Sequence, residues 1–375
     1  MKITFLVSGS IQSNFSYRAL TLARFLSKLG HEVSIIAPSA DKYNNFIPTK
    51  ADDIDGVKIL YPFQFIRRRA EIDFLPYLFG AIRLLLRERP QVIYVYKPTP
   101  LSIVGLLGRL LRKTLVIVDF DDLGAEVMRI EGHPPYQRKL VEYSERCAAR
   151  WADRMVVAST YLYKIYTVQY PRKPMHMMPN GVEPSWFGPT MPSDESKRIV
   201  FMGSINRKGI LDPLFDVMPE ITQRYQDAKL LIIGDVQFLE YFKDRVVKQG
   251  LTDYVTFTGW LPIEQARERL YASDIGYCVM PQGKATSAAS YMKVPQYMAR
   301  GVVPLVSDVG DLRLTIENGA AGYFCRADDV ALLKDVLLRA LEDPKRFEKA
   351  QRARKYSEDA LNWSHLAEDF ERWLS

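Results

Sequence analysis

Short apolar runs that end in small residues and lead into helical patterns recur along the whole chain. Residues 2–7 read as a continuous buried strand, residues 8–13 as a small-residue turn, and the apolar spacing from residue 20 as a helix that ends at Gly30. A second buried strand follows at residues 31–37. Because two parallel strands need a crossover helix, this opening is a β-α-β unit of a doubly wound sheet. The sequence therefore predicts an α/β protein.

The same alternation continues through both halves of the chain. In the first half, the further predicted segments are strands at residues 92–96, 115–118 and 155–158 and a helix at residues 101–111. In the second half, amphipathic helices connect predicted strands at residues 198–202, 229–233, 254–257 and 275–279. Neither half contains the full glycine fingerprint of dinucleotide-binding enzymes, so a nicotinamide cofactor is disfavoured. We expect two Rossmann-like domains, each built on a parallel sheet.

A proline-rich break separates the two halves. Four prolines between residues 179 and 192 exclude a helix there, and the polar run that follows is typical of a linker. We predict an N-terminal domain of residues 1–183, a C-terminal domain of residues 184–355, and a last helix within residues 356–375 that packs back on the N-terminal domain. Open α/β folds bind ligands at the carboxyl ends of their strands, so the expected active site is a cleft between the two sheets.

Cysteine usage and the N-terminus predict a cytoplasmic protein. Cys147, Cys278 and Cys325 lie far apart without metal-ligand spacing, which is typical of a reducing compartment. The opening apolar run, residues 1–10, is too short for a signal peptide or a membrane span.

Positive charge is concentrated between residues 65 and 113. Ten Lys and Arg residues stand there against three Asp and Glu residues, in a chain whose formal net charge is +7. Aromatic and aliphatic residues interleave with these charges, which is the mixture expected of a surface that rests on anionic lipid. A solvated face over an ordinary core is the alternative interpretation. Nucleic acid is disfavoured as a partner, because no recognised binding module accompanies the charge.

Seven stretches in a fixed order carry a resemblance to a known family. They are GHEVSII, PNGVEPSWF, FMGSINRKG, KLLIIGD, VTFTGWLP, YASDIGYCVMP and KVPQYMARGVVPLVSDVG. Each is weak on its own, but the ordered set resembles the retaining, nucleotide-sugar-dependent glycosyltransferases of family 4, which have the two-Rossmann GT-B fold. The resemblance covers nearly the whole chain. It implies two Rossmann-like domains facing each other across a cleft.

The resemblance implies a donor site in the C-terminal domain. Lys208 stands where the family places a cation on the diphosphate, and a lysine suits such a point charge. The family often has an arginine directly after the glycine at position 203, but this chain has Ser204 there. One phosphate contact is therefore either missing or supplied by Arg207. The alternative interpretation of Lys208 is a basic surface residue at a helix start.

The stretch KVPQYMARGVVPLVSDVG reads as a helix that ends at a glycine and leads into a buried strand. The helix start near Ser290 is expected to seat the leaving diphosphate, since free N–H groups and the helix dipole attract anions. Where the family usually has two glutamates, this chain has Ala288 and Gln296, and a Gln amide can still hydrogen-bond ribose hydroxyls. Recognition of the sugar is then expected to shift to neighbouring side chains, namely Lys284, Thr286, Ser287 and Lys293.

In the N-terminal domain, the resemblance points to the segment VIVDFDDLGAE. The family often has a histidine there facing the sugar, and Asp121, with Asp122 beside it, is the nearest equivalent. A carboxylate there can accept a hydrogen bond from a sugar hydroxyl or orient the acceptor. The alternative is that both carboxylates cap the following helix. Asp119 and Asp121 also mimic the metal-binding Asp-x-Asp of the other large glycosyltransferase fold, but that motif belongs to a single mixed domain, so no metal is expected.

The turn after the first strand is the candidate acceptor site. It reads Ser8-Gly9-Ser10, where many relatives have a glycine pair. Gly9 permits a close backbone approach, and the hydroxyl of Ser10 can bind a sugar hydroxyl or a phosphate. A plain tight turn is the alternative.

These features together predict a hexosyltransferase that moves a sugar from a nucleoside-diphosphate sugar to a glycan or lipid-linked acceptor with retained configuration. We expect it to need no cofactor and to associate with the inner face of the membrane. Two alternatives remain open. In one, Ala288 and Gln296 mark a catalytically degenerate GT-B protein that acts as a binding or partner subunit, which would show no nucleotide affinity. In the other, a nucleotide-sugar isomerase or hydrolase converts the donor without an acceptor.

Overall fold

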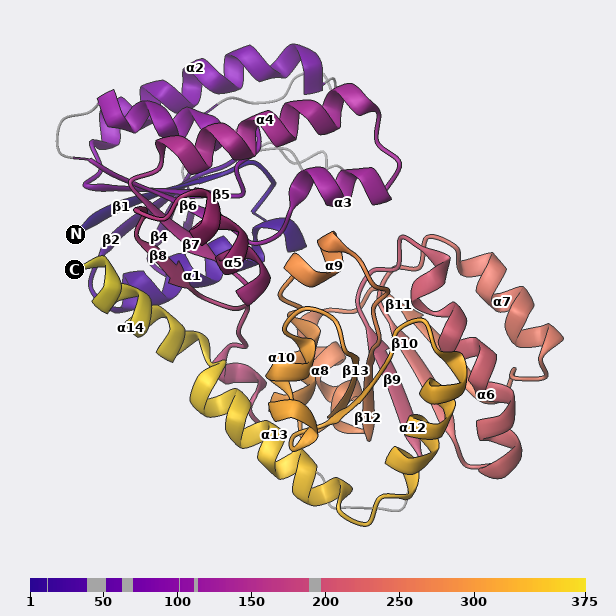
Figure 1. The fold of residues 1–375 in the computed structure, drawn as a ribbon. Helices are drawn as coiled ribbons and strands as arrows, with labels where there is room; N and C mark the ends of the chain where they lie inside the picture. The colour runs from indigo at the N-terminus through magenta and orange to yellow at the C-terminus, as the bar shows by residue number, and fades with distance from the viewer. Residues whose placement is uncertain (12, 39–51, 63–69, 101, 111–113, 189–196) are drawn as a thin grey trace. The chain divides into compact units, whose positions relative to one another are not determined.

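The computed structural model describes residues 1–11, 13–38, 52–62, 70–100, 102–110, 114–188 and 197–375. The chain divides into two compact units (Figure 1). Unit 1 comprises Met1–Pro179 and Trp363–Ser375, and unit 2 comprises Asn180–Asn362. The division after Pro179 falls at the start of the proline-rich segment.

Unit 1 is built on a mixed sheet whose strand order, over the described residues, is β3-β4-β2-β1-β5-β6-β7-β8. Its strands are β1 (Lys2–Val7), β2 (Glu32–Ile36), β3 (Asp52–Ile54), β4 (Val57–Leu60), β5 (Val92–Tyr96), β6 (Leu115–Phe120), β7 (Arg154–Val157) and β8 (Met175–Met177). All neighbours pair in parallel except β3 and β4, which pair antiparallel. Strands buried on both faces need apolar side chains at nearly every position, which the continuous runs of β1 and β5 provide.

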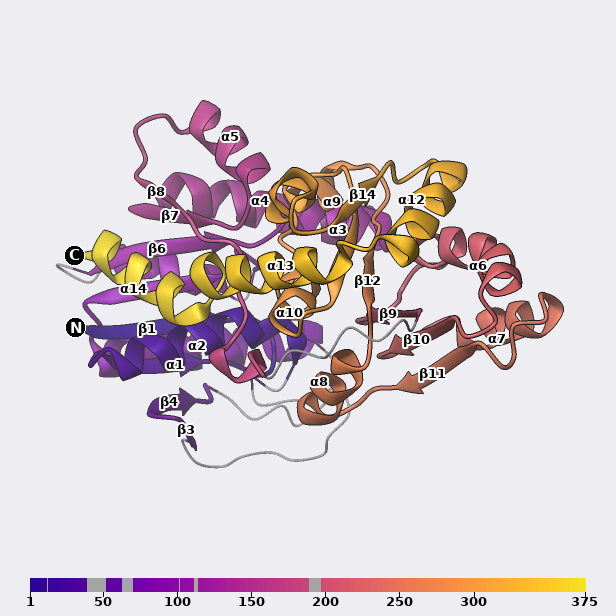
Figure 2. The ribbon, with the colours of Figure 1, turned by 90° about the horizontal axis from the view of Figure 1, so that it is seen from below.

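Helices cover both faces of this sheet. They are η1 (Asn14–Ser16), α1 (Tyr17–Lys28), α2 (Ala70–Glu88), η2 (Ser102–Leu110), α3 (Gly124–Ile130), α4 (Pro135–Trp151), α5 (Thr160–Gln169) and α14 (Trp363–Leu374). Figure 1 shows α2 and α4 over one face, and Figure 2 shows α1 and α14 in front of the other. No helix among the described residues is long and apolar enough to cross a membrane.

The last helix belongs to unit 1, although the chain passes through unit 2 before reaching it. Trp363 and Phe370 of α14 are buried in the same apolar cluster as Leu22 of α1. The Arg154 side chain donates a hydrogen bond to the carbonyl of Trp373 at 2.7 Å. Unit 1 is therefore completed by a helix from the far end of the chain.

Two features of unit 1 differ from the sequence-based expectation. Within the predicted helix at residues 101–111, the structure describes a 3-10 helix, η2, over Ser102–Leu110, and this helix lies close to the sheet: a Cβ added to Gly105 would lie 2.5 Å from the Val95 side chain. The expectation of a purely parallel sheet misses the antiparallel pair β3–β4, whose turn uses Asp55 and Gly56 at positive φ.

Unit 2 is a second doubly wound unit. Its all-parallel sheet, with the order β11-β10-β9-β12-β13-β14, consists of β9 (Arg198–Met202), β10 (Lys229–Ile233), β11 (Val255–Gly259), β12 (Ile275–Cys278), β13 (Val303–Ser307) and β14 (Tyr323–Cys325). The predicted strand positions agree with β9 to β12 to within two residues.

Helices again flank both faces of the sheet. They are η3 (Pro184–Trp186), η4 (Lys208–Ile210), α6 (Asp212–Arg224), α7 (Leu239–Lys248), α8 (Ile263–Tyr271), α9 (Lys284–Ala288), α10 (Lys293–Ala299), α11 (Leu312–Thr315), η5 (Glu317–Gly319), α12 (Val330–Glu342) and α13 (Arg346–Ala360). Figure 1 shows α6 with α12 on one side of this sheet and α10 with α13 on the other. The carboxyl ends of β9, β10, β12 and β13 carry the turns that matter below.

Candidate active site

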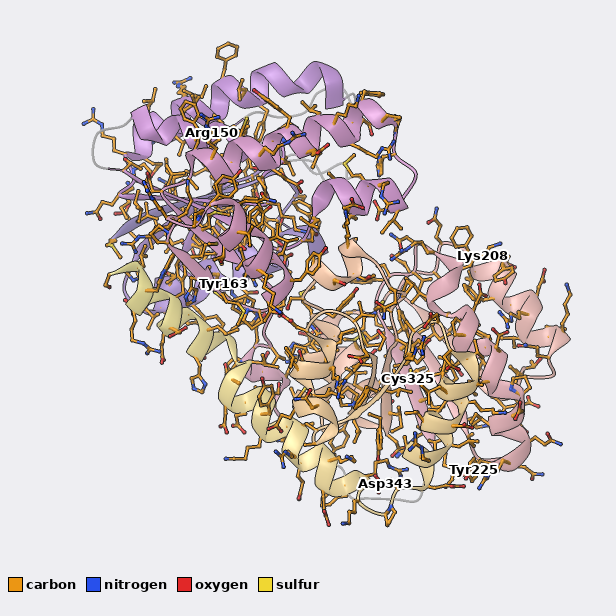
Figure 3. The ribbon with its side chains drawn as sticks, viewed as in Figure 1. Arg150, Tyr163, Lys208, Tyr225, Cys325 and Asp343 are labelled. Carbon is orange, nitrogen blue, oxygen red and sulfur yellow. The ribbon has the colours of Figure 1, made fainter. Side chains whose placement is uncertain are left out.

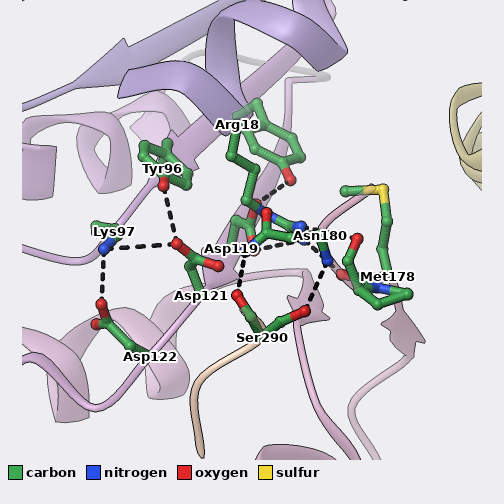
Figure 4. A network of polar contacts seen from close by, with 11 residues as sticks. Arg18, Tyr96, Lys97, Asp119, Asp121, Asp122, Met178, Asn180 and Ser290 are labelled. Carbon is green, nitrogen blue, oxygen red and sulfur yellow. Dashed lines mark hydrogen bonds and ion pairs between the residues drawn. The ribbon is translucent and has the colours of Figure 1, made fainter. Parts of the chain in front are cut away.

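The carboxyl ends of β5 and β6 bring an ammonium and two carboxylates together in unit 1 (Figure 4). The Lys97 Nζ atom lies 2.6 Å from Asp122 Oδ2 and 3.5 Å from Asp121 Oδ2. The hydroxyl of Tyr96 donates a hydrogen bond to Asp121 Oδ2 at 3.0 Å. Since one cation faces two anions, this edge of the sheet keeps an excess of negative charge.

Lys97 is held in an unusual environment. Burial disfavours its ammonium, but Asp122 and Asp121 outweigh burial, so the pKa of Lys97 is raised above its ordinary value. Its φ of 53° lies in the left-handed region, which a side chain with a Cβ rarely adopts. Such backbone strain tends to occur at functional sites, where the surrounding contacts enforce it.

Glu145 of α4, and not the aspartates, satisfies the first amides of α3. Gly124 and Ala125 donate backbone hydrogen bonds to its carboxylate, and the N-cap residue of α3 is Leu123, which makes no side-chain cap. The capping interpretation of Asp121 and Asp122 is therefore not supported at these amides. Burial, and then the charge of Asp122, raise the pKa of Glu145 to about 7.

This carboxyl predicts a pH dependence of stability. The pKa of Glu145 is about 7 in the folded protein against an ordinary value of 4.5, so its stabilising proton is fully bound below pH 4.5 and is lost as the pH rises through 7. Glu145→Gln keeps a carbonyl acceptor without the charge, and should be more stable than wild type by on the order of 2 kcal/mol near pH 8 and by nothing near pH 4. Urea unfolding at both pH values measures this. The matched change Glu126→Gln on α3 should leave the pH slope unaltered, and an unchanged slope in Glu145→Gln contradicts the assignment.

The predicted acceptor turn lies at the same edge of unit 1. A Cβ added to Gly9 would lie 2.5 Å from the Phe15 ring, and that ring lies 4.8 Å from Lys97 Nζ. The carbonyl of Ser10 accepts hydrogen bonds from the amide and hydroxyl of Ser13. Phe15 thus connects the turn at Gly9 and Ser10 to the carboxylates at Asp121 and Asp122.

Asp119, the first aspartate of the Asp-x-Asp pattern, is fully engaged elsewhere. It is completely buried, and its Oδ2 atom accepts from Arg18 Nε at 2.8 Å and from the Tyr94 hydroxyl at 2.6 Å. Arg18 also donates to the carbonyls of Met178 and Pro179 at 2.7 and 3.1 Å (Figure 4). Asp119 is therefore part of a buried ion pair.

In unit 2, two glycine turns lie against each other at the ends of β9 and β10. Gly203 has a φ of 137° and Gly234 a φ of 123°, both unfavourable for any other residue. A Cβ added to Gly234 would lie 2.5 Å from the carbonyl oxygen of Gly203. Only glycine at position 234 allows this close backbone approach.

Lys293, the first residue of α10, points at the Gly203 turn. Its Nζ atom lies 3.9 Å from the centre of the Phe201 ring, and 3.2 Å from where a Cβ on Gly203 would be. Burial lowers the pKa of Lys293 from its ordinary value. Among the described residues, no carboxylate pairs with it. Within the part of the chain that the structure describes, the site therefore holds a half-buried cation without a carboxylate counter-ion.

The two cations after β9 lie differently. Lys208 is exposed, with its Nζ atom 4.0 Å from the centre of the Tyr241 ring, at the surface of unit 2 (Figure 3). Arg207 is half-buried, and its Nε atom is buried without a hydrogen-bond partner among the described residues. Its charge acts on Tyr291, whose pKa is raised by burial and partly lowered again by Arg207. Arg207 thus lies near the segment that precedes α10.

The segment before α10 corrects one expectation. The helix begins at Lys293 and not near Ser290, because Ser290 holds Asn180 instead of capping a helix: the Asn180 amide donates to Ser290 Oγ, and the Asn180 side chain donates to the Ser290 carbonyl, both at 2.8 Å (Figure 4). Gln296 is buried within α10, with 8% of its surface exposed, and Ala288 is completely buried.

The remaining predicted donor residues are spread over neighbouring turns. Ser204 is exposed directly after Gly203. A Cβ added to Gly310 would lie 2.6 Å from the carbonyl oxygen of Ser287. The turn after β13 therefore packs on α9. Thr286 is tied to the turn, since its hydroxyl donates to the Gly283 carbonyl at 2.9 Å.

Two hollows lie away from all of these residues. One of about 760 Å³ runs beside the edge strand β14 and is lined by Tyr323, Cys325 and Asp343, among others. The other, of about 450 Å³, lies at the amino end of β7 and β8 in unit 1. Neither of these two is lined by a predicted site residue.

Sequence reasoning missed Lys97, Tyr96 and Glu145. Lys97 could have been found, because it directly follows a predicted strand next to the one that precedes Asp121, and both strands end at the same edge of the sheet. Glu145 gave no comparable signal, since it lies in the middle of a helix far along the chain.

Comparison with known proteins matches both units to models of glycosyltransferases. The family model described as Glycosyltransferase Family 4 matches residues 16–186, and the model described as Glycosyl transferases group 1 matches residues 196–343. Phosphatidyl-myo-inositol mannosyltransferase of Mycolicibacterium smegmatis is 22% identical over 351 residues, which cover 91% of this chain and 83% of the relative. Its namesake of Mycobacterium tuberculosis is 22% identical over 98% of this chain and 93% of its own length.

Solved structures share the fold over the full length of the chain. Sucrose-phosphate synthase from Thermosynechococcus elongatus has a TM-score of 0.79 at 18% identity and covers 100% of this chain and 98% of its own. Anabaena Alr3699/HepE in complex with UDP has a TM-score of 0.71 at 15% identity, with 100% and 99% covered. Both of the predicted Rossmann-like halves are thus confirmed.

Proposed function

Because this chain belongs to glycosyltransferase family 4 and has the GT-B fold, we propose that it transfers a hexose from a nucleoside-diphosphate sugar to a glycan or lipid-linked acceptor with retention of configuration. Unit 2 binds the donor and unit 1 presents the acceptor. The structural neighbour from Anabaena that binds UDP supports a nucleoside diphosphate, and the similar phosphatidyl-myo-inositol mannosyltransferases support a lipid-linked acceptor.

The observation that carries the donor site is the unpaired ammonium of Lys293. A cation that loses water on burial, and gains no carboxylate, lies higher in free energy than one with a counter-ion. A diphosphate placed at the Gly203 turn would supply that counter-ion, and the bare backbone of Gly203 leaves room for it. Anion binding would then raise the pKa of Lys293 back toward its ordinary value.

The other predicted donor residues are assigned to different parts of the donor. We assign Arg207 to the second phosphate, because its half-buried guanidinium has an unsatisfied Nε atom. Lys208 and Ser204 are exposed and are assigned to the outer side of the diphosphate. Ser287, Ser290 and Gln296 are assigned to the sugar and ribose hydroxyls; the Ser290 hydroxyl accepts from Asn180 and so still has its own proton to donate.

In unit 1 the carboxylates of Asp121 and Asp122 are assigned to the transfer step. Asp121 can accept a hydrogen bond from the attacking hydroxyl, while Asp122 remains paired with Lys97. Gly9 and Ser10 line the acceptor side of the same edge. Retaining transfer depends on stabilising the leaving diphosphate and on positioning, so Lys293 and Arg207 can supply the needed positive charge without a cofactor.

A pair of variants tests the two halves of this proposal. Lys293→Met should weaken UDP binding at least about tenfold in titration calorimetry, since it removes a charge-assisted contact in a low-dielectric site. Asp121→Asn should bind UDP like wild type but transfer sugar at least about tenfold more slowly. Unaltered UDP affinity in Lys293→Met would show that the diphosphate site at Lys293 and Gly203 is assigned wrongly. A fully active Asp121→Asn would show that Asp121 has no catalytic role. A wild-type protein with no affinity for any of UDP, GDP, ADP or TDP would favour the degenerate binding subunit.

A lipid-linked acceptor implies work at the inner face of a membrane. Peripheral contact with anionic lipid and a cytoplasmic location remain part of the proposal, with no role for nucleic acid. The basic stretch at residues 65–113 was the predicted contact surface, but residues 63–69, 101 and 111–113 lie outside the described part of the chain. That includes Arg67, Arg68 and Arg69.

A further inference from the structure

Helix α4 exposes an apolar stripe along its whole length. Tyr136, Leu140, Tyr143 and Trp151 are 64%, 52%, 63% and 52% exposed, and Cys147 is half-buried between the last two. These residues recur at intervals of three or four, which places them on one side of a helix. The opposite side, with Ser144, Ala148 and Ala149, is buried against unit 1. A helix that is already anchored by its inner side therefore exposes a second, apolar side.

A row of cations runs beside this stripe. Lys139, Arg146 and Arg150 are exposed and recur at intervals of seven and four, so they lie next to the stripe on the same outward surface. The one exposed acid on the helix between them is Glu142, which pairs with Arg146 at 2.9 Å. The outward surface of α4 is therefore apolar along one line and cationic along the next.

The end of the helix opens onto the hollow of about 450 Å³ at the amino end of β7 and β8. Arg150 and Arg172 line it, and both are exposed, without an ion pair among the described residues. Lys173 also lines it, but donates its ammonium protons to the carbonyls of Arg150 and Ala152. Figure 3 shows Arg150 at this end of α4. Asp153 is the one acidic residue among its lining residues, so cations outnumber anions at this hollow.

We propose that α4 lies flat on an anionic phospholipid surface, with the stripe in the interfacial region and headgroup phosphates at Arg150 and Arg172. Tyrosine and tryptophan favour that region because one end of each ring is apolar and the other polar, and neighbouring cations add attraction to anionic lipid. The helix has 17 residues and is thus roughly 25 Å long, enough for several headgroups.

Charge decides between lipid and a second copy of the chain. In a symmetric dimer that pairs α4 with an antiparallel copy of itself, the row of Lys139, Arg146 and Arg150 would face the same row of the partner, and like charges in contact repel. An anionic surface instead matches the row. Helix α2 and η2 support the choice: both pack with each other, η2 also packs with α4, and they expose Phe79 and Leu107. A membrane-bound α4 would bring the protein to a lipid-linked acceptor. The biological purpose of this surface, but not the surface itself, rests on the proposed function.

The test uses the full chain and two double variants in co-sedimentation with phosphatidylcholine vesicles, with and without phosphatidylglycerol. Leu140→Ala with Tyr143→Ala should lower binding to the anionic vesicles at least about tenfold. The matched pair Leu314→Ala with Phe347→Ala also removes one exposed aliphatic and one exposed aromatic side chain, but from unit 2. It should bind the vesicles like wild type.

Arg150→Gln with Arg172→Gln should weaken binding to vesicles with phosphatidylglycerol and leave binding to pure phosphatidylcholine unchanged. Full vesicle binding by the Leu140 and Tyr143 variant overturns the proposal. So does a dimer of the wild type in sedimentation equilibrium that this variant dissociates. UDP calorimetry on the same variant separates the two proposals: unaltered UDP affinity with lost vesicle binding supports the α4 surface, whatever the outcome at Lys293.

Discussion

Replacing Arg18 by methionine should lower the free energy of unfolding of unit 1 by about 3–5 kcal/mol, because the change leaves the Asp119 carboxylate buried without its partner. Both side chains are almost completely buried, at 1% and 0% exposed, and Arg18 Nε lies 2.8 Å from Asp119 Oδ2. The guanidinium also satisfies the carbonyls of Met178 and Pro179, which would lose their donor. Methionine fills a similar volume, so the cost is electrostatic and not that of a cavity.

Urea unfolding, together with hydrogen exchange of the β1 and β6 amides, measures this change. The two-unit chain need not unfold in one step, so the exchange data assign the loss to unit 1. Arg24→Met, on the same helix, breaks a partly exposed pair with Asp55 and should cost less than about 1 kcal/mol. Adding Asp119→Asn to Arg18→Met should recover part of the loss, because a neutral amide is cheaper to bury than a carboxylate. Equal stability of the Arg18 and Arg24 variants would contradict this account.

The network around Arg18 also shows what a sequence pattern reveals and what it conceals. Strands such as β1, β5 and β9 could be predicted because each is a short, continuous apolar run, which only a strand buried on both faces requires. The partners of Arg18 could not, since Asp119 lies 101 residues and Met178 160 residues away along the chain. Chemistry that depends on the meeting of distant segments leaves no local period in the sequence.

The candidate site divides in the same way. Lys293, Gly203 and Asp121 were predicted from the ordered motifs of a family, whereas their burial and contacts needed the structure. Lys208, the predicted cation on the diphosphate, lies exposed over Tyr241, and Lys293 is half-buried beside Gly203. Burial and the lack of a counter-ion increase the contribution of a charge to the free energy of binding. Both depend on the tertiary structure. The hydrogen bond from the Asn180 amide to Ser290 Oγ is likewise hidden from a sequence pattern, because the two residues lie 110 positions apart.

Replacing Gly234 by alanine should destabilise unit 2 by about 2–4 kcal/mol and weaken UDP binding at least about tenfold. Gly234 has a φ of 123°, where an L-residue is strained, and its new Cβ would lie 2.5 Å from the carbonyl oxygen and 2.8 Å from the carbonyl carbon of Gly203. These atoms belong to the backbone, so no side-chain rotation relieves the clash. The turn at Gly203 must shift, and this turn is the part of the proposed donor site that faces Lys293.

Gly250→Ala is the matched control. Gly250 also has a positive φ, of 68°, but nothing lies within 4 Å of its added Cβ, so the change should cost only the left-handed penalty of about 1 kcal/mol and leave UDP affinity unchanged. Urea unfolding and UDP calorimetry on both variants separate backbone strain from close approach. Equal losses of stability in the two would mean that the contact between the two glycine turns contributes nothing. Lost stability with intact UDP affinity in Gly234→Ala would place the diphosphate away from Gly203, because a displaced turn could not then be part of its seat.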